Sequence, residues 1–305
     1  MIDLHTHSTA SDGSFQPAEL IRAAADKGLR ALALTDHDTV DGLAGAGAEA
    51  ERRGLWFIPG IELEISRGKY LKNGEAQEVS GEFHLLGLGI NWKNPVFSQA
   101  VADLGRYREA RNREILQRMG DMGIEADYEE LRSLGGGSIG RPHFAALLLR
   151  RGIVKNREQA FAQYLGGGRP LYVPKKGLDF TYALEIIHAA GGIAVLAHPM
   201  SLYIAWAHLP GFIKQLAGQG LDGMEAWHPT AKPRICKRLE ALGRSLGLII
   251  TAGSDFHGAA RPDRKLGLTA GGREIGDSYL EGLPARGPLP QTRPIGYDGP
   301  TLTKE

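Results

Sequence analysis

Short apolar runs alternate with helical patterns along most of the chain. The run Leu29–Thr35 is continuous and ends at polar residues, as in a strand that is buried on both faces. The stretch Pro17–Lys27 is typical of a helix, because proline lies in its first turn and Gly28 follows it. Further helices are expected at Val40–Arg53, Thr181–Ala190, Gly211–Gly220 and Pro233–Leu246. The expected strands are Met1–His5, Leu29–Thr35, Leu55–Ile65, Phe83–Ile90, Ile193–Ala197, Leu221–Trp227 and Leu248–Ala252.

Strands that are separated mainly by helices favour a parallel sheet or barrel, so the pattern predicts an α/β fold. The alternation stops between residues 96 and 176, where helical patterns dominate and no convincing core strand is found. We therefore expect a barrel built from residues 1–95 and 177–270, with residues 96–176 as a mainly helical insertion. Residues 271–305 are rich in glycine and proline and lack periodicity, which predicts a loosely ordered C-terminal tail.

The insertion differs from the rest of the chain in charge. Residues 96–176 contain 14 Lys and Arg against 9 Asp and Glu, a formal charge of +5, and the remainder contains 22 against 26, a charge of −4. A basic insertion over an acidic barrel is the polarity that attracts a phosphorylated substrate. The alternative is a solvated helical face, because five arginines can simply coat one exposed helix. These are Arg106, Arg108, Arg111, Arg113 and Arg118.

Composition excludes several classes of protein. The hydrophobic content of 42% and the charged fraction of 23% are ordinary for a soluble globular protein, and the formal net charge is only +1. The single cysteine, Cys236, excludes an intrachain disulfide and suits a reducing compartment. No apolar run reaches the roughly 18 residues that span a bilayer, and no basic region with an apolar stretch precedes His5. We therefore expect a cytoplasmic protein with no signal peptide and no membrane partner.

Residues of the types that bind metals lie at or beside most of the expected strands. In a strand, residues i and i+2 point to the same side, so His5 and His7 can aim two ligands at one point. The same spacing relates Asp255 and His257, and a parallel barrel brings the ends of its strands together. Imidazole and carboxylate ligands without a thiolate suit Zn, Mn or Fe. The nine candidate ligands are His5, His7, Asp12, His37, Glu62, His84, His198, Asp255 and His257.

Residues beside these candidates offer further roles. Glu64 faces the same side of its strand as Glu62 and competes with it as a ligand. Asp36 and Asp38 flank His37 and are candidates for the hydrogen-bonding partners that orient metal ligands. A metal cluster is predicted whichever of the two glutamates binds.

The segments that carry these residues are similar to the motifs of a known family. They are His5-Thr6-His7-Ser8, Ser11-Asp12-Gly13, Thr35-Asp36-His37-Asp38-Thr39, Pro59-Gly60-Ile61-Glu62, Ala197-His198-Pro199 and Gly253-Ser254-Asp255-Phe256-His257-Gly258. In combination they resemble the PHP (polymerase and histidinol phosphatase) superfamily over residues 1–92 and 181–258. The resemblance implies a distorted (β/α)7 TIM-like barrel with two or three divalent metal ions at the strand ends. Manganese is the first expectation, and Fe, Zn and Mg are the alternatives.

The resemblance also implies which residues hold which ion. Glu62 is expected to bridge two ions, and Glu62 and Asp255 are the expected catalytic carboxylates. Many relatives have histidine at the position of Asp12, so both two and three ions stay open. The first set of ligands is His5, His7, Glu62 and Asp255, the second is Glu62, His84 and His198, and the third is Asp12, His37 and His257.

The insertion carries a closer resemblance. Its segments Gly140-Arg141-Pro142-His143-Phe144-Ala145, Ala160-Phe161-Ala162-Gln163-Tyr164-Leu165 and Pro170-Leu171-Tyr172-Val173-Pro174 are similar to those of the TrpH/YciV-like subfamily. This implies hydrolysis of a nucleoside 3′,5′-bisphosphate to the 5′-monophosphate and phosphate, by a hydroxide that the metal ions activate. The alternatives are a 5′-3′ exoribonuclease that trims short RNA, a histidinol phosphatase and a non-enzymatic degenerate barrel. We expect a small phosphorylated nucleotide or short RNA as the partner, and no DNA duplex.

Residues outside the ligand set are expected to contact the substrate. Arg141, together with Lys175 or Lys176, is a candidate for gripping a phosphate, because a guanidinium fork matches phosphate oxygens. Arg141 would also stabilise charge during the reaction. His228 and His143 are candidates for binding the substrate and protonating the leaving alkoxide.

Overall fold

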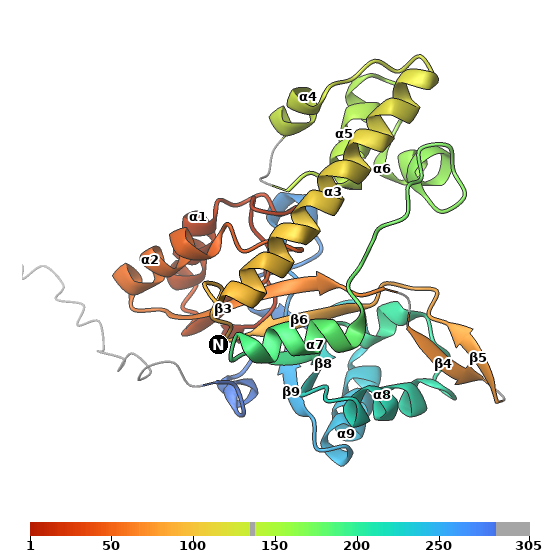
Figure 1. The fold of residues 1–305 in the computed structure, drawn as a ribbon. Coiled ribbons are helices and arrows are strands. Elements are labelled where there is room, and N and C mark those ends of the chain that lie inside the picture. The colour runs from red at the N-terminus through yellow and green to blue at the C-terminus, as the bar shows by residue number, and fades with distance from the viewer. Residues whose placement is uncertain (67, 73, 135–137, 285–305) are drawn as a thin grey trace, which may run out of the picture.

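The computed structural model describes residues 1–66, 68–72, 74–134 and 138–284. Within these residues, seven strands form one sheet in the order β1-β2-β3-β6-β7-β8-β9 (Figure 1). Each of them lies within a run that the apolar pattern predicted. Their bounds are β1 Ile2–Asp3, β2 Ala31–Leu34, β3 Trp56–Glu64, β6 His84–Leu88, β7 Ile193–Leu196, β8 Gly223–Trp227 and β9 Ile249–Ala252.

The sheet is nearly closed into a barrel. A parallel bridge joins Thr6 to Phe256, and the amide of His7 donates a 2.9 Å hydrogen bond to the carbonyl of Phe256. These contacts link the segment after β1 to the segment after β9, which are the two ends of the sheet. The predicted fold class, an α/β fold with a distorted TIM-like barrel, is confirmed.

One strand runs against the predicted parallel direction. β6 pairs antiparallel with both β3 and β7. The described residues of the connection from β3 to β6 form a hairpin of β4 (Lys69–Lys72) and β5 (Glu75–Glu78) and no helix. A reversal of chain direction needs no crossover helix. The hairpin was not predicted, because its short strands are largely polar and exposed. As a consequence His84, the first residue of β6, lies opposite Glu64, the last residue of β3.

Helices cover the outside of the barrel where the periodicity predicted them (Figure 1). On α1, for example, Leu20, Ile21 and Ala24 are buried. Cys236 is fully buried on α9, as expected for a packing residue. No helix in the described part of the chain is long and apolar enough to cross a membrane. The bounds are α1 Pro17–Asp26, α2 Leu43–Arg53, α7 Phe180–Ala189, α8 Leu209–Gly218 and α9 Pro233–Ser245.

The insertion is helical and has a hydrophobic core of its own. Its longest helix, α3 (Pro95–Asp121), has 27 residues and is therefore about 40 Å long. Phe97, near its start, is buried in the barrel core, whereas Ile115 and Met119 are buried in the second core. Figure 1 shows α3 rising from the barrel to the other helices of the insertion, which we call the cap. They are α4 Tyr128–Ser133, α5 Arg141–Arg150, α6 Arg157–Ala160 and the π-helical turn Phe161–Leu165.

The boundaries at residues 96 and 176 stay a prediction, and α3 contributes to both cores. The expectation of a loose tail from residue 271 is wrong for residues 271–284. Ile275 is fully buried, and its carbonyl accepts a 2.9 Å hydrogen bond from the amide of Ile2. A few isolated apolar residues anchor this stretch, and such anchors leave no periodic signal in a sequence rich in glycine. The rest of the predicted tail, residues 285–305, lies outside the described residues.

Candidate metal centre

All nine candidate ligands lie at one rim of the barrel. His5 and His7 follow β1, and His198 follows β7. Asp255 and His257 follow β9. Each of the nine belongs to a group of at least three side chains whose ligand atoms lie within 4.8 Å of one another. The structure therefore brings all nine candidate ligands together, whereas the competing Glu64 belongs to none of these groups.

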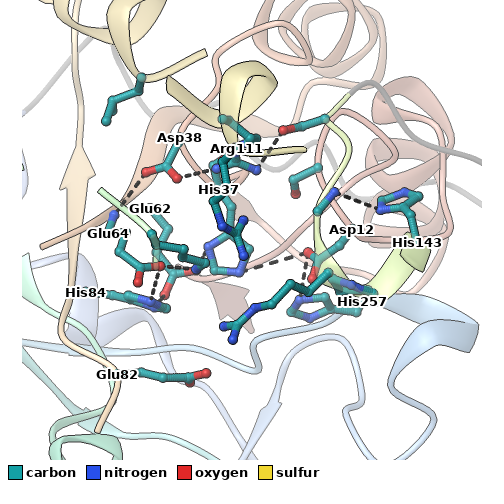
Figure 2. A pocket seen from close by; sticks show the side chains of 18 of the residues that line it. Asp12, His37, Asp38, Glu62, Glu64, Glu82, His84, Arg111, His143 and His257 are labelled. Carbon is teal, nitrogen blue, oxygen red and sulfur yellow. Dashed lines mark hydrogen bonds and ion pairs between the residues drawn. The ribbon is translucent and has the colours of Figure 1, made fainter. Parts of the chain in front are cut away.

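Glu62 lies at the centre of these groups and is almost completely buried. Its Oε1 is 2.8 Å from Nδ1 of His84 and 2.9 Å from Nε2 of His198. Its Oε2 is 3.1–3.3 Å from a ring nitrogen of each of three other histidines, His5, His7 and His37. The two carboxylate oxygens thus face two different sets of imidazole nitrogens, as a carboxylate that was to bridge two ions would have to. Figure 2 shows Glu62 between His37 and His84.

A second carboxylate, that of Asp12, lies among histidine rings at the other end of the cluster (Figure 2). Its Oδ1 lies 3.2 Å from Nε2 of His257 and 4.0 Å from Nε2 of His37. The same oxygen is 3.9 Å from Nδ1 of His7. Together with His7, these residues can supply four ligand atoms to one ion.

The donor set fits divalent cations. Oδ1 of Asp12 and Nε2 of His84 are buried and form no well-aligned hydrogen bond in the described chain, although Oδ1 lies 3.2 Å from Nε2 of His257 and Nε2 of His84 lies 3.4 Å from Glu64. Buried polar atoms without a partner are costly, and so are lone pairs that converge without a positive charge. A cation beside these atoms would satisfy both needs. Six imidazoles and three carboxylates without a thiolate are a set that suits Zn, Mn or Fe.

Burial and neighbouring charges shift the pKa values of the cluster residues in opposite directions. Burial alone would raise the pKa of Glu62, but His37, His5 and His84 together hold this pKa well below its ordinary value. Burial would lower the pKa of His7, yet its contacts with Asp255 and Glu62 raise it to about 10. Since a ligating nitrogen must be deprotonated, the metal ions and protons compete for these rings.

Sequence reasoning missed Glu225, a buried residue of β8. Its Oε1 accepts a 3.0 Å hydrogen bond from Nδ1 of His5, and its Oε2 accepts a 2.8 Å bond from the amide of His198. The first contact directs Nε2 of His5 toward Glu62, and the second fixes the turn that carries His198. One signal was present in the sequence, because Glu225 is an acidic residue in an otherwise apolar strand.

We expect Glu225→Gln to weaken metal binding by about 10- to 100-fold while the fold is retained. An amide keeps the size of the side chain, but its NH2 group cannot accept the bond from either His5 or the His198 amide. Titration of the metal-free protein with Mn²⁺ against a fluorescent chelator measures the change. Glu49→Gln is the matched control, because Glu49 is as buried as Glu225 but lies on α2 and pairs with arginines. Equal affinities in the two variants would contradict the role given to Glu225.

Asp36 and Asp38 were predicted to orient metal ligands, but their side chains bond to loop residues beside the nine candidate ligands. Asp36 accepts hydrogen bonds from the amide and hydroxyl of Ser8, both at 2.7 Å, and from the Ser11 hydroxyl at 2.6 Å. It thereby fixes the loop that carries Asp12. Asp38 accepts a 3.0 Å bond from the amide of Glu64 and forms an ion pair with Arg108 of α3.

The backbone is strained beside the candidate ligands. Four non-glycine residues in the described chain have a positive φ, and three of them lie at or next to the cluster. His198 and Asp255 are candidate ligands themselves, and Asp38 follows His37. Such conformations persist only where the surrounding structure imposes them, and they gather at functional sites. The fourth residue, Tyr203, lies five positions after His198.

A cavity of 230 Å³, which we call the cap cavity, lies between the cluster and the cap. Arg141, the first residue of α5, faces it and is 5.8 Å from the ring of Phe161 and 6.0 Å from that of Tyr172. Within the described part of the chain no acidic side chain pairs with Arg141, so its charge is available to an anion. The other cations of the cavity wall are Arg108, Arg111, Arg157, Lys175, Lys176 and Arg261.

Lys175 and Lys176, both predicted to bind phosphate, differ in their contacts. Lys175 forms an ion pair with Glu64, which holds the pKa of that carboxyl far below its ordinary value although burial would raise it. Nζ of Lys176 lies 4.0 Å from the centre of the Tyr107 ring. Both line the cap cavity, and among the residues that the structure describes no carboxylate pairs with Lys176.

The two candidate general acids occupy different surroundings. Nδ1 of His143 accepts a 3.1 Å hydrogen bond from the Gly140 amide at the start of α5, on the far side of Asp12 from Glu62 (Figure 2). His228 is buried, and burial lowers its pKa. Its Nε2 lies 3.3 Å from Oδ2 of Asp255 and 3.2 Å from an amino nitrogen of Arg264, which sequence reasoning also missed.

Comparison with known proteins gives concordant matches. The PHP domain model matches residues 3–166. A 5′-3′ exoribonuclease of Haemophilus influenzae is 34% identical over 84% of this chain and 89% of its own length. A 3′,5′-nucleoside bisphosphate phosphatase of Chromobacterium violaceum is 33% identical over 96% of this chain and 94% of its own. A solved structure from Bifidobacterium adolescentis, described as a metal-dependent phosphoesterase, has a TM-score of 0.75 and 26% identity over 92% of this chain and 93% of that one.

Proposed function

The chain belongs to the PHP domain family, and on this premise we propose that it hydrolyses nucleoside 3′,5′-bisphosphates to nucleoside 5′-monophosphates and phosphate. It is a hydrolase of phosphoester bonds, as its relatives are. The observation that carries the proposal is the position of Arg141, which pairs with no carboxylate of the described chain and lines the same cavity as Glu62. A bisphosphate has one phosphate to react at the cluster and a second to be bound by the cap.

Each part of the site has a task in this reaction. Glu62, Asp255 and the surrounding histidines would hold two or three divalent ions, with manganese first. Bound ions would lower the pKa of a water molecule and offset negative charge on the reacting phosphate. Arg141 would bind the 5′-phosphate through two parallel hydrogen bonds and so orient the nucleoside. Lys176 adds positive charge on the same cavity wall.

The P–O3′ bond breaks in this reaction, and the leaving 3′-oxygen takes up a proton. His228 is poorly suited to supply it, because burial lowers its pKa and Arg264 lies 3.2 Å from its Nε2. We propose that His228 instead holds Asp255 in place, and that the proton comes from His143 or from water in the cap cavity. His143 lines that cavity.

The same bond cleavage accounts for the alternative activity, the trimming of RNA from its 5′ end. In an RNA chain the reacting phosphate carries a further nucleotide, and everything else about the bond is the same. A histidinol phosphatase would not need the cations of the cap cavity to bind a second phosphate. A non-enzymatic barrel would be expected to lack ligands, whereas all nine candidate positions are filled.

A substrate panel tests the proposed function. The panel contains adenosine 3′,5′-bisphosphate, AMP, histidinol phosphate and a short 5′-phosphorylated RNA, each with Mn²⁺, Mg²⁺ or Zn²⁺. We expect rapid phosphate release from the bisphosphate and none above background from AMP, whose only phosphate is the one that the cap would bind. Faster release from AMP or histidinol phosphate than from the bisphosphate would overturn the proposal.

The purified protein should contain two to three transition-metal ions per chain, mainly Mn, Fe or Zn. The reason is the density of imidazole and carboxylate ligands without a thiolate. Elemental analysis after purification in metal-supplemented medium measures the content. Less than one ion per chain would show that the cluster is not a metal site.

A further inference from the structure

A second cavity adjoins the cluster on the side away from His37 and Asp12. It has a volume of 910 Å³, against 230 Å³ for the cap cavity, and we call it the outer cavity. His228, Thr230 and Arg264 line the outer cavity and not the cap cavity, whereas Asp12 and His37 line the cap cavity and not the outer one. The two cavities meet at the residues that they share, which include Glu64, Arg141, His198, Asp255 and Arg261. A ligand at the cluster can therefore extend in two directions.

The outer cavity has groups suited to a phosphorylated chain. Arg261 lines it and, in the part of the chain that the structure describes, forms no ion pair with a carboxylate. The hydroxyls of Ser66, Ser80 and Thr230 add polar groups to its wall. Two further cations are already paired, Lys175 with Glu64 and Arg264 with Asp255. The carboxylates of Glu64, Glu82 and Asp255 also line the cavity, so its wall is polar and carries charges of both signs.

Tyr203 lines the outer cavity and is 76% exposed, more than any other exposed large apolar residue of the described chain. It ends the 3-10 turn Pro199–Leu202 that directly follows the candidate ligand His198, and its φ is 55°. A tyrosine in this left-handed conformation is unfavourable, so the turn holds the ring at the cavity against the preference of its backbone. An exposed aromatic face beside cationic groups is the kind of surface on which nucleobases stack.

We propose that the outer cavity receives the nucleotide downstream of the reacting phosphate, and that Tyr203 stacks on its base. This rests on the proposed function, since it assumes that the phosphoester reacts at the cluster. A bond forms from the oxygen of water to phosphorus, and the P–O3′ bond of the upstream nucleoside breaks. The upstream 3′-oxygen takes one proton of the water, and the phosphate stays on the 5′-oxygen of the downstream nucleotide. Tyr203 then determines specificity for phosphodiesters. A mononucleotide substrate does not contact it.

Tyr203→Asn is the variant of choice, because asparagine enters the left-handed region readily and so preserves the turn while removing the ring. We expect kcat/KM to fall about 5- to 100-fold on a 5′-phosphorylated penta-adenylate RNA, the range for one base stacked on an aromatic ring. On adenosine 3′,5′-bisphosphate the variant should match the wild type. Tyr203→Phe should retain activity on both substrates. Tyr182→Ala is the control, because Tyr182 is 41% exposed on α7 and lines neither cavity.

A binding measurement separates this inference from the proposed function. Fluorescence anisotropy with the same RNA, labelled at its 3′ end, gives a Kd that does not require turnover. If the wild type hydrolyses neither substrate but Tyr203→Asn weakens RNA binding about 5- to 100-fold, the proposed function fails and the stacking site stands. Equal losses on RNA and bisphosphate would overturn the stacking role, as would unchanged kcat/KM and Kd for RNA.

Discussion

Glu62→Gln should lower the turnover of a nucleoside bisphosphate by at least about 1,000-fold, or about 4 kcal/mol in activation free energy. Both oxygens of Glu62 are committed, one toward His84 and His198 and the other toward three more histidines. An amide has no negative charge with which to hold two cations close together, and its NH2 group is not a ligand. Steady-state phosphate release and elemental analysis of the same preparation measure the effect on turnover and on metal content.

The control for this variant is His188→Ala, which should be as active as the wild type. His188 is exposed on α7, and its Nε2 forms a 2.7 Å contact with Asp222 outside both cavities. Near-wild-type activity in Glu62→Gln would mean that another carboxylate bridges the ions. Glu64 is the alternative, because it lies 3.4 Å from Nε2 of His84, although its ion pair with Lys175 occupies it in the structure.

Arg141→Ala should lower kcat/KM for adenosine 3′,5′-bisphosphate by about 10- to 1,000-fold, or about 1.4–4 kcal/mol, and leave the metal content unchanged. The guanidinium lies at the junction of the two cavities, against Phe161 and Tyr172, without a carboxylate partner in the described chain. The loss should be smaller on p-nitrophenyl phosphate, which has no second phosphate for the cap to bind. Parallel kinetics on the two substrates test this difference.

Arg150→Ala provides the matched control for Arg141→Ala. Arg150 is the last residue of the same helix, α5, where it pairs with Glu130 and lines neither cavity. Its removal tests whether losing a cap arginine matters in itself. Equal losses of Arg141→Ala on both substrates would place the guanidinium at the reacting phosphate. Full activity on both would leave Arg141 with a packing role only.

Several features of the fold followed from local patterns in the sequence. The strands and the barrel helices were predictable because each buries a continuous or periodic apolar face. Such a face can be recognised within one contiguous segment of the sequence. The helical character of the insertion followed for the same reason. The polar residues that follow the strands identified the candidate ligands, because strand ends converge in a barrel whatever the loops do.

Features that depend on distant partners were not predictable. The reversal of β6 depends on a polar hairpin in the connection from β3, and the apolar pattern of a strand does not state its direction. The position of Ile275 depends on the hydrogen bond that its carbonyl accepts from the amide of Ile2.

The sequence by itself determined which residue types gather at the rim, since strand patterning and ligand chemistry are local properties. Only the tertiary structure decided how they are held. Glu225 acquires its role by meeting His5, 220 positions away, and Arg264 by meeting Asp255 and His228. The strained turn at Tyr203 likewise has no signature in its own residues. Hydrogen bonds and cavities of this kind form between segments that only folding brings together. They therefore exist only in the assembled barrel and cap.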